Sequence, residues 1–436
     1  MTSSFIVSGL GGRKLLSGTI RVNGSKNALA PALAAPFIFR EPLSLAHTPL
    51  LEDLRRTEEL FAALGVETTA QERTYTFTVP KIINPVLPED IAKRMRASIL
   101  FTGPILARFG SVSFPHPGGC VIGERPIDIF LDGYRAMGAS VKVNKRHYYI
   151  SAPKGGLRGA MIYFRVQSVT ATETFALAAL LARGTTILKN AAVEPEITAL
   201  LRFLEASGAR IEGIGTHTLV IRGGGLLACK APRYEIMPDR IEAGCFLILA
   251  ALAGRDVTIA GCEPSHLDSI IAFLSDAGVP LSIGKRNIVI SAKKSRVPYR
   301  SVNIKTHEYP GFPTDLQAPA VVFLTQAAGD AAVFETIFEG RLNYVHELNR
   351  MGASIRMMDP HRVLVKGPTK LVGKTLESPD LRAGLAYIIA GIIANGRSVI
   401  HNAYHVDRGY EQVEERLRGI GANIVRMDDV GMAETR

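Results

Sequence analysis

The sequence predicts an α/β protein of two domains, each built from three repeats of about 70 residues. One observation is a pattern that recurs six times: the end of a half-apolar helix, a glycine and a short β-rich stretch. A second is length, since one hydrophobic core rarely grows beyond about 250–300 residues and the chain has 436. The recurring glycines are Gly65, Gly138, Gly208, Gly278, Gly352 and Gly421.

Each repeat contains a helix that ends just before its glycine. Apolar residues at positions i, i+3 and i+4 predict that this helix is half-buried. The glycine then stands where a helix end favours a left-handed residue. Such helices are predicted at 54–64, 197–206 and 411–419, and strands follow later repeats' glycines at 148–151, 218–221 and 287–291.

A second helix in the repeat is apolar on all sides, which predicts that it is buried. Four of these helices are predicted at 28–35, 175–182, 245–253 and 385–394, and strands follow the last three at 185–188, 256–259 and 397–400. The repeats divide into two sets of three near residue 237, where prolines at 232 and 238 suit a segment that crosses between domains.

Composition excludes several classes of protein. The hydrophobic fraction of 47% and the charged fraction of 21% are ordinary for a globular chain. The longest apolar run is about 385–394, well short of the roughly 20 residues of a membrane span, and no secretion signal is expected at the N-terminus. The four cysteines form no CxxC pair, which favours reduced thiols in the cytoplasm. No metal site or cofactor motif is found in the histidine spacing.

The net charge of +11 has two interpretations. The basic residues are spread along the chain without a basic run, so we do not expect nucleic acid as a partner. A solvated basic surface is the simpler interpretation. The alternative is a cleft that attracts a small substrate with several negative charges.

Charged residues open the buried helices at matching places in the repeat. Aspartate is an ordinary helix cap, which is the simplest interpretation of Asp239 and Asp380. A cation at a helix start opposes the helix dipole, so we expect a bound anion beside such residues. The charged residues at these helix starts are Lys26, Arg96, Asp239, Arg240, Asp315, Asp380 and Arg382.

A second layer of arginines follows the middle strand of three repeats. Arg125 and Arg408 each stand 13 residues before their repeat's glycine, and Arg341 stands 11 before. Each arginine alone is usually part of a surface ion pair. Together, at matching positions, they predict a site for phosphate and carboxylate groups, because arginine binds both with two parallel hydrogen bonds.

One turn is longer and contains the sequence Gly118-Gly119-Cys120. A glycine-rich loop can carry a reactive group over a cleft, and a thiol beside Arg125 can have a lowered pKa. A lone cysteine is more often a small buried hydrophobic residue. That interpretation suits Cys245 and Cys262, which lie in apolar segments, better than Cys120.

These motifs resemble the bacterial UDP-N-acetylglucosamine 1-carboxyvinyltransferases, a family of enolpyruvyl transferases. The resemblance extends over nearly the whole chain. It rests on the motifs at 24–28 (Gly-Ser-Lys-Asn-Ala), 96–99, 117–120 (Pro-Gly-Gly-Cys), 123–128 (Gly-Glu-Arg-Pro-Ile-Asp), 194–197, 238–242, 312–315, 338–341, 380–383 and 405–410.

The resemblance implies two inside-out α/β barrels of three repeats each. It assigns 24–236, with the Cys120 loop, to one domain, and 1–23 plus 237–436 to the other, with the active site in the cleft between them. It implies transfer of the enolpyruvyl group of phosphoenolpyruvate to the 3′-hydroxyl of UDP-N-acetylglucosamine, without a metal or cofactor. It also implies a cytoplasmic enzyme of cell-wall synthesis, with roles in cell shape and division, that fosfomycin inhibits.

The resemblance also implies roles for single residues. Cys120 would be the acid and the target of fosfomycin, and Asp315 would take up the hydroxyl proton or orient the hydroxyl. Lys26, Asn27 and the arginines would hold phosphoenolpyruvate. The implied set is Lys26, Asn27, Arg96, Cys120, Arg125, Pro126, Ile127, Asp128, Ile129, Ser168, Val169, Asp315, Ile337, Arg341, Arg382 and Arg408.

Two alternatives remain open at the level of the sequence. The stretch 166–173 lacks a lysine that many members carry beside the uridine, so a different nucleotide acceptor is one alternative. The other is a catalytically silent relative that only binds a sugar nucleotide or a protein. The presence of Lys26, Cys120 and Asp315 argues against a silent protein. The sequence does not indicate an oligomeric state.

Overall fold

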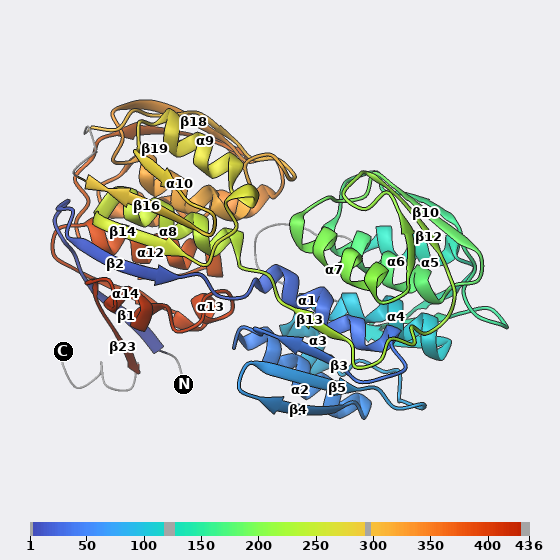
Figure 1. The fold of residues 1–436 in the computed structure, drawn as a ribbon. Coiled ribbons are helices and arrows are strands. Elements are labelled where there is room, and N and C mark those ends of the chain that lie inside the picture. Colours follow the sequence, from blue (N-terminus) through green and yellow to red (C-terminus); the bar gives the residue numbers. More distant parts are fainter. Residues whose placement is uncertain (1–2, 117–126, 293–297, 429–436) are drawn as a thin grey trace. The chain divides into compact units, whose positions relative to one another are not determined.

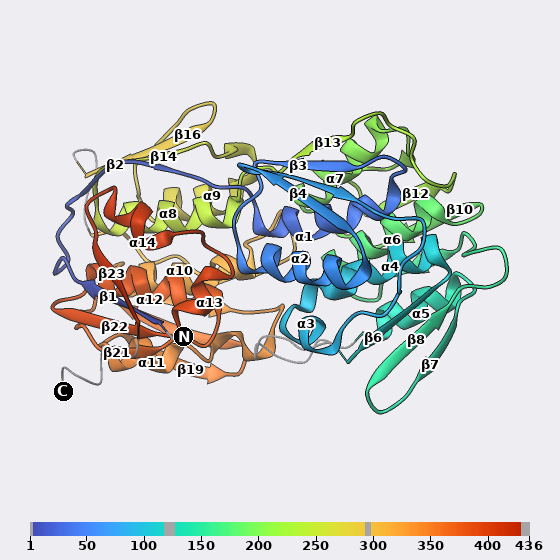
Figure 2. The ribbon, with the colours of Figure 1, turned by 90° about the horizontal axis from the view of Figure 1, so that it is seen from below.

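The computed structural model describes residues 3–116, 127–292 and 298–428 and has a mixed α/β fold, which confirms the predicted class. Within these residues the chain forms two compact units. Of the described residues, those up to Asn23 and from Pro238 onward belong to unit 1, and those between Gly24 and Met237 belong to unit 2. Figure 1 and Figure 2 show the elements of each unit.

Unit 1 contains three four-stranded sheets, with strand orders β21-β22-β1-β23, β15-β16-β14-β2 and β17-β18-β20-β19. The N-terminal strand lies between two strands from the C-terminal end of the chain, with Phe5 opposite Ile400 and Ile6 opposite Val425. The strands are β1 Ser3–Ser8, β2 Leu16–Arg21, β14 Gly254–Ala260, β15 Leu281–Ile283, β16 Asn287–Ser291, β17 Ile304–Lys305, β18 Gly329–Phe334, β19 Ser354–Asp359, β20 Arg362–Gly367, β21 Thr375–Glu377, β22 Arg397–His401 and β23 Asn423–Asp428.

The helices of unit 1 form an inner and an outer group. The inner helices α8, α10 and α12 pack against one another, and each also packs on a strand of a different sheet (Figure 1). The helices are α8 Arg240–Ala253, η3 Pro264–His266, α9 Asp268–Asp276, η5 Thr314–Leu316, α10 Gln317–Leu324, η6 Glu339–Leu342, α11 Val345–Arg350, α12 Leu381–Ile393, α13 Ala403–Asp407 and α14 Val413–Arg418.

Unit 2 contains two four-stranded sheets, β13-β3-β5-β4 and β11-β12-β10-β9, and the three-stranded sheet β6-β8-β7. Its inner helices α1, α4 and α6 also pack together. The strands are β3 Leu43–Ala46, β4 Glu67–Gln71, β5 Thr74–Thr78, β6 Ser111–Pro115, β7 Ser140–Val143, β8 His147–Ser151, β9 Met161–Tyr163, β10 Thr185–Lys189, β11 Arg210–Glu212, β12 Thr218–Arg222 and β13 Arg233–Glu235. The helices are α1 Lys26–Ala34, η1 Ala35–Ile38, α2 Glu52–Leu64, α3 Glu89–Arg94, η2 Arg96–Ser98, α4 Ile99–Phe109, α5 Asp128–Ala136, α6 Val169–Leu181 and α7 Pro195–Ala206.

The inner helices confirm the prediction made from their composition. Helices that are apolar on all sides must be enclosed by protein. In α8 and α12, nearly every residue is buried, and most residues of α6 and of α1 after Asn27 are buried as well. The helix α10, which was not among the four predicted helices, shows the same pattern. The core of each unit is therefore built around these helices. Within the described residues, no helix is long and apolar enough to cross a membrane.

The repeat glycines also behave as predicted. All six have positive φ angles, between 78° and 104°, where a side chain is disfavoured. The outer helix predicted at 411–419 instead begins at Val413, because Gln412 has a left-handed backbone with a φ of 44°. The preceding segment therefore forms a turn rather than a helix, and this turn carries Tyr410.

Gly65 allows a direct test of the helix ends. It terminates α2 with a φ of 78° and a ψ of 18°, and an added Cβ would meet no atom within 4 Å. Gly65→Ala should therefore lower the free energy of unfolding by about 1–2 kcal/mol through backbone strain alone. Gly65→Asn should cost less, since asparagine tolerates this conformation. Urea denaturation measures both; equal stability of Gly65→Ala and the native chain would contradict the assignment.

Candidate functional site

The starts of the inner helices of unit 1 bring charged residues together. Asp239 caps α8, and its Oδ1 accepts hydrogen bonds from the amides of Ile241 and Glu242 at 2.8 and 3.0 Å. Asp380 caps α12 in the same way, with the amides of Arg382 and Ala383 at 2.7 and 3.1 Å. The capping interpretation of these two aspartates is confirmed, and both carboxylates are engaged by backbone donors.

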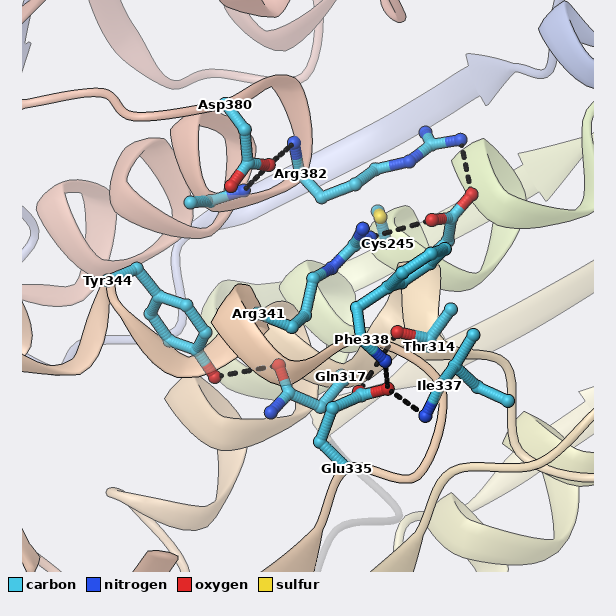
Figure 3. A network of polar contacts seen from close by, with 12 residues as sticks. Cys245, Thr314, Gln317, Glu335, Ile337, Phe338, Arg341, Tyr344, Asp380 and Arg382 are labelled. Carbon is cyan, nitrogen blue, oxygen red and sulfur yellow. Dashed lines mark hydrogen bonds and ion pairs between the residues drawn. The ribbon is translucent and has the colours of Figure 1, made fainter. Parts of the chain in front are cut away.

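Asp315 binds two arginines, Arg341 and Arg382, both of which are labelled in Figure 3. Its Oδ1 is 2.6 Å from Nη2 of Arg341, and its Oδ2 is 2.8 Å from Nη2 of Arg382. Asp315 is carried by η5, Arg341 by η6 and Arg382 by the first turn of α12. The arginine side chains are only 5% and 3% exposed, whereas that of Asp315 is 23% exposed. The structure thus brings together three residues that are separated by up to 67 positions in the chain.

The electrostatics of this cluster favour an anion. Removal from water alone would raise the pKa of Asp315, but the charges of Arg382 and Arg341 outweigh it and hold that pKa well below its usual range. The carboxylate is therefore ionised at neutral pH. Two guanidinium groups share this single carboxylate, so one positive charge remains in excess among the three groups. Buried guanidinium groups in this arrangement can bind carboxylate or phosphate.

A buried carboxylate holds the backbone around this cluster. Glu335, at the end of β18, accepts hydrogen bonds from the amides of Ile337 and Phe338 at 2.9 and 3.2 Å. Its other oxygen accepts from the hydroxyl of Thr314 at 2.9 Å. Because Thr314 precedes Asp315 directly, one side chain links the turn containing Ile337 to the segment that carries Asp315.

Arg382 makes a second contact through its other terminal nitrogen. Its Nη1 donates to the hydroxyl of Tyr410 at 2.9 Å, and its guanidinium lies 5.5 Å from the centre of the Tyr410 ring. The Tyr410 hydroxyl is also 3.5 Å from the thiol of Cys245, which is fully buried in α8. Arg408, two residues before Tyr410, is half-buried and follows α13.

In unit 2, Lys26 is the first residue of α1, as predicted, and Ser25 caps the helix. The Lys26 ammonium lies 3.4 Å from Oδ2 of Asp53, which is nearly buried near the start of α2. In the structure, carboxylates of the protein lie beside two of the predicted cations, that of Asp53 beside Lys26 and that of Asp315 beside Arg382. Binding of an anion at these helix starts stays a prediction.

The other predicted residues of unit 2 lie on separate elements. Asn27 follows Lys26 in α1, Arg96 opens η2, and Ser168 caps α6 through the amide of Ala171. Val169 is the first residue of α6, and Ile127, Asp128 and Ile129 lie at the start of α5. Cys120, Arg125 and Pro126 lie outside the described residues, so the structure places neither the loop cysteine nor its neighbouring arginine.

Unit 2 also holds a buried carboxylate that the sequence reading did not single out. Glu173 lies in α6, and burial raises its pKa well above the usual value, with further contributions from Glu194 and Glu196. Its Oε1 has no hydrogen-bond partner among the described atoms. The charge of Lys26 opposes this rise in the pKa of Glu173, so Glu173 lies within the electrostatic reach of Lys26. Among the described residues, no group of three or more His, Cys, Asp or Glu side chains is arranged to hold a metal ion.

The chain is similar to known proteins in sequence and in structure. The chain matches the family described as EPSP synthase (3-phosphoshikimate 1-carboxyvinyltransferase) over residues 10–417. A UDP-N-acetylglucosamine 1-carboxyvinyltransferase from Solibacter usitatus (strain Ellin6076) is 42% identical over 414 residues, which cover 95% of this chain and 97% of that protein.

Two solved structures share the fold. The enolpyruvyl transferase NikO from Streptomyces tendae has a TM-score of 0.85 at 23% identity and covers 98% of this chain and 99% of its own. An EPSP synthase from Acinetobacter baumannii has a TM-score of 0.75 at 19% identity, with 98% and 100% coverage.

The pKa of Asp315 gives a prediction for stability against pH. A carboxylate whose pKa is lowered by folding stabilises the protein above its unfolded pKa of about 3.9 and loses this effect as pH falls through the folded pKa. Asp315→Asn removes the charge and does not titrate. The loss of unfolding free energy in this variant should therefore be largest near neutral pH and should shrink below about pH 4.

Urea denaturation at a series of pH values measures this difference. Asp330→Asn, at an exposed position of β18, is the matched control and should show little change. A loss for Asp315→Asn that stays constant or grows toward acid pH would show that the carboxylate is not stabilised by the arginines.

Proposed function

The chain belongs to the EPSP synthase family of carboxyvinyltransferases, and we propose that it transfers the enolpyruvyl group of phosphoenolpyruvate to the 3′-hydroxyl of UDP-N-acetylglucosamine and releases phosphate. This reaction is the first committed step of peptidoglycan precursor synthesis. The observation that carries the proposal is the likeness, along almost the entire length, to a curated enzyme named for this reaction.

The reaction requires a proton donor, a positioned hydroxyl and fixed positive charges. A proton adds to the methylene carbon of phosphoenolpyruvate, and the hydroxyl oxygen attacks the cationic carbon beside it. The intermediate then loses a proton from the methyl group and the phosphate group, which leaves an enolpyruvyl ether. Positioned acid and base groups typically contribute about 10²–10⁴-fold to such steps. Fixed cations stabilise the charges that develop on the phosphate and carboxylate.

The cluster around Asp315 supplies part of this machinery in our proposal. Arg341 and Arg382 would bind the carboxylate region of phosphoenolpyruvate, together with Arg408. While it is paired with both arginines, Asp315 is a weak base, because its pKa is held low. An incoming anion that takes over the arginines would release the Asp315 carboxylate, which could then accept a hydrogen bond or a proton from the 3′-hydroxyl. Binding of phosphoenolpyruvate and release of the Asp315 carboxylate to act on the 3′-hydroxyl would therefore be linked.

Other residues complete the proposed site. Lys26, Arg125 and Arg408 would hold the phosphate of phosphoenolpyruvate with Asn27, and Cys120 would donate the proton. The sugar nucleotide would contact a further set of residues: Arg96, Arg125, Pro126, Ile127, Asp128, Ile129, Ser168, Val169, Asp315 and Ile337. Both units would therefore contribute residues to the substrate site.

The proposal extends to the architecture. We propose that the domains are 24–236 and 1–23 with 237–436, each an inside-out barrel of three repeats. The division of the chain into two units, the three sheets of each unit and the six glycines with positive φ support this description. An enzyme of this reaction would act in the cytoplasm, where it would serve cell-wall synthesis and thereby cell shape and division.

Phosphate release tests the proposed reaction. The native chain should release phosphate from phosphoenolpyruvate when UDP-N-acetylglucosamine is present, and mass spectrometry should detect the enolpyruvyl ether of that nucleotide. UDP-glucose and UDP-N-acetylgalactosamine serve as comparison acceptors. Faster release with another nucleotide would assign a different acceptor, and no release with any of them would favour a silent relative.

Cys120 provides a second test. Cys120→Ser should reduce turnover by about 10²–10⁴-fold, the usual loss when a general acid is removed, because a hydroxyl is a far weaker acid than a thiol. Cys120→Asp should retain turnover, since a carboxylic acid can also donate a proton, but it should no longer react with fosfomycin.

Peptide mass mapping after fosfomycin treatment locates the adduct. It should form on Cys120 in preference to Cys229, Cys245 and Cys262, the last two of which are buried. An adduct on another cysteine, or full activity in Cys120→Ala, would remove Cys120 from the mechanism.

A further inference from the structure

Arg382 is held by two hydrogen bonds of different character. Its Nη2 binds the Asp315 carboxylate at 2.8 Å, and its Nη1 binds the neutral hydroxyl of Tyr410 at 2.9 Å. The two bonds use different nitrogens of the guanidinium, and their partners differ in exposure: the Asp315 side chain is 23% exposed, whereas Tyr410 is fully buried. A substrate anion can therefore reach the nitrogen that binds Asp315 more easily than the nitrogen that binds Tyr410. The bond to Tyr410 can therefore persist while the bond to Asp315 is exchanged.

Arg341 lacks such an anchor. Its Nη2 binds Asp315 at 2.6 Å, and its guanidinium lies 5.6 Å from the centre of the Phe338 ring. No second hydrogen bond of its guanidinium is found in the part of the chain that the structure describes. When Asp315 is displaced, Arg341 keeps only its packing, whereas Arg382 keeps a directed hydrogen bond. Arg382 is thus the better preorganised of the two arginines.

Tyr410 is well suited to a fixed, neutral role. Its side chain is fully buried, and its ring lies beside the guanidinium it binds. Since its oxygen accepts a hydrogen bond from Arg382, its own proton is free to point toward the Cys245 thiol, 3.5 Å away. Burial raises the pKa of Tyr410 well above its ordinary value and that of Cys245 to about 12. Both groups therefore stay neutral throughout the range in which enzymes operate.

The backbone before Tyr410 lies against the same arginine. A Cβ added to Gly409 would be 2.5 Å from Cδ1 of Leu381 and 3.7 Å from Nη1 of Arg382. The amides of Gly409 and Tyr410 both donate to the carbonyl of Val406, which closes a tight turn after α13. The turn that carries Arg408 thus packs closely on the start of α12. The Tyr410 hydroxyl adds a hydrogen bond between this turn and Arg382.

We propose that Tyr410 is a positioning residue, which fixes the Arg382 guanidinium and the Arg408 turn in the geometry that binds the phosphoenolpyruvate anion. This inference rests on the proposed function and adds a residue to its site. Tyr410 does not touch the reacting atoms in this account. It acts through Arg382, so loss of its hydroxyl should weaken the binding of phosphoenolpyruvate and leave the binding of the sugar nucleotide unchanged.

The test compares two buried tyrosines whose hydroxyl groups have different hydrogen-bond partners. Tyr410→Phe removes the hydroxyl bound to Arg382 and keeps the ring. Tyr387→Phe is the matched control: its hydroxyl is also buried and lies on α12, but it donates to the carbonyl of Tyr344 at 3.0 Å. Thermal melting establishes that both variants fold. Initial rates of phosphate release are then measured with each substrate varied in turn.

Tyr410→Phe should raise the KM for phosphoenolpyruvate about 10- to 100-fold, the range expected for a hydrogen bond to a charged group. The KM for UDP-N-acetylglucosamine should stay within about twofold of native, and Tyr387→Phe should change neither KM. Cys245→Ala, which removes the thiol that lies 3.5 Å from the Tyr410 hydroxyl, should cause a smaller change in the same direction. This variant keeps the proposal testable if Tyr410→Phe does not fold.

Several outcomes would overturn the proposal. The first is a native KM for phosphoenolpyruvate in both Tyr410→Phe and Cys245→Ala. The second is an equal rise in this KM in Tyr410→Phe and Tyr387→Phe. The third is a rise in Tyr410→Phe that is equal for the KM of phosphoenolpyruvate and the KM of UDP-N-acetylglucosamine. Titration calorimetry with phosphoenolpyruvate separates this inference from the proposed function. Weaker binding to Tyr410→Phe than to Tyr387→Phe would support the positioning role even if the native chain released no phosphate. Phosphate release by the native chain with no effect of Tyr410→Phe would sustain the function and refute the role of Tyr410.

Discussion

The sharing of one carboxylate by two buried arginines is the interaction on which the proposed site depends. Guanidinium groups that are 3% and 5% exposed require a counter-charge, because an unpaired buried charge is strongly destabilising. Asp315 supplies one negative charge for two positive ones, and it is the most exposed member of the group. Among these three groups one positive charge remains in excess, and in the proposed site a substrate anion would bind there. In this account Asp315 occupies the place of the substrate anion until the substrate arrives.

The fold brings these groups together through the starts of its inner helices. Asp239 and Asp380 satisfy the free amides at the starts of α8 and α12, so those amides are not available to a ligand. In the proposed site, the side chains of Arg341 and Arg382 bind the anion. Tyr410 holds Arg382, and Glu335 holds the segment of Asp315 through Thr314. Unit 2 repeats part of this arrangement, with Lys26 at a helix start and Asp53 beside it.

Much of this could be predicted from periodic features of the sequence. The repeated glycines indicated left-handed helix ends, and runs of apolar residues indicated the inner helices, because both signals are local. The charged residues Lys26, Asp315, Arg341 and Arg382 were found through their matching positions in the repeat. The pairing of Asp315 with two arginines was not predicted, since it depends on contacts 26 and 67 residues apart in the chain. Glu335 and Tyr410 were also missed as supporting residues, although Tyr410 lies inside the motif at 405–410 and Glu335 lies three residues before the motif at 338–341. No local feature of the sequence distinguishes a buried hydrogen-bond acceptor from one on the surface.

The central claim is that the phosphoenolpyruvate anion replaces Asp315 on Arg382, while Arg382 keeps its hydrogen bond to the Tyr410 hydroxyl. A crystal structure of the chain with phosphoenolpyruvate and a sugar nucleotide that lacks the 3′-hydroxyl, which cannot react, tests this most directly. The account predicts that Nη2 of Arg382 contacts the donor anion and no longer Asp315, while Nη1 remains within hydrogen-bond distance of the Tyr410 hydroxyl. A bound donor with both arginines still paired to Asp315 would contradict the account.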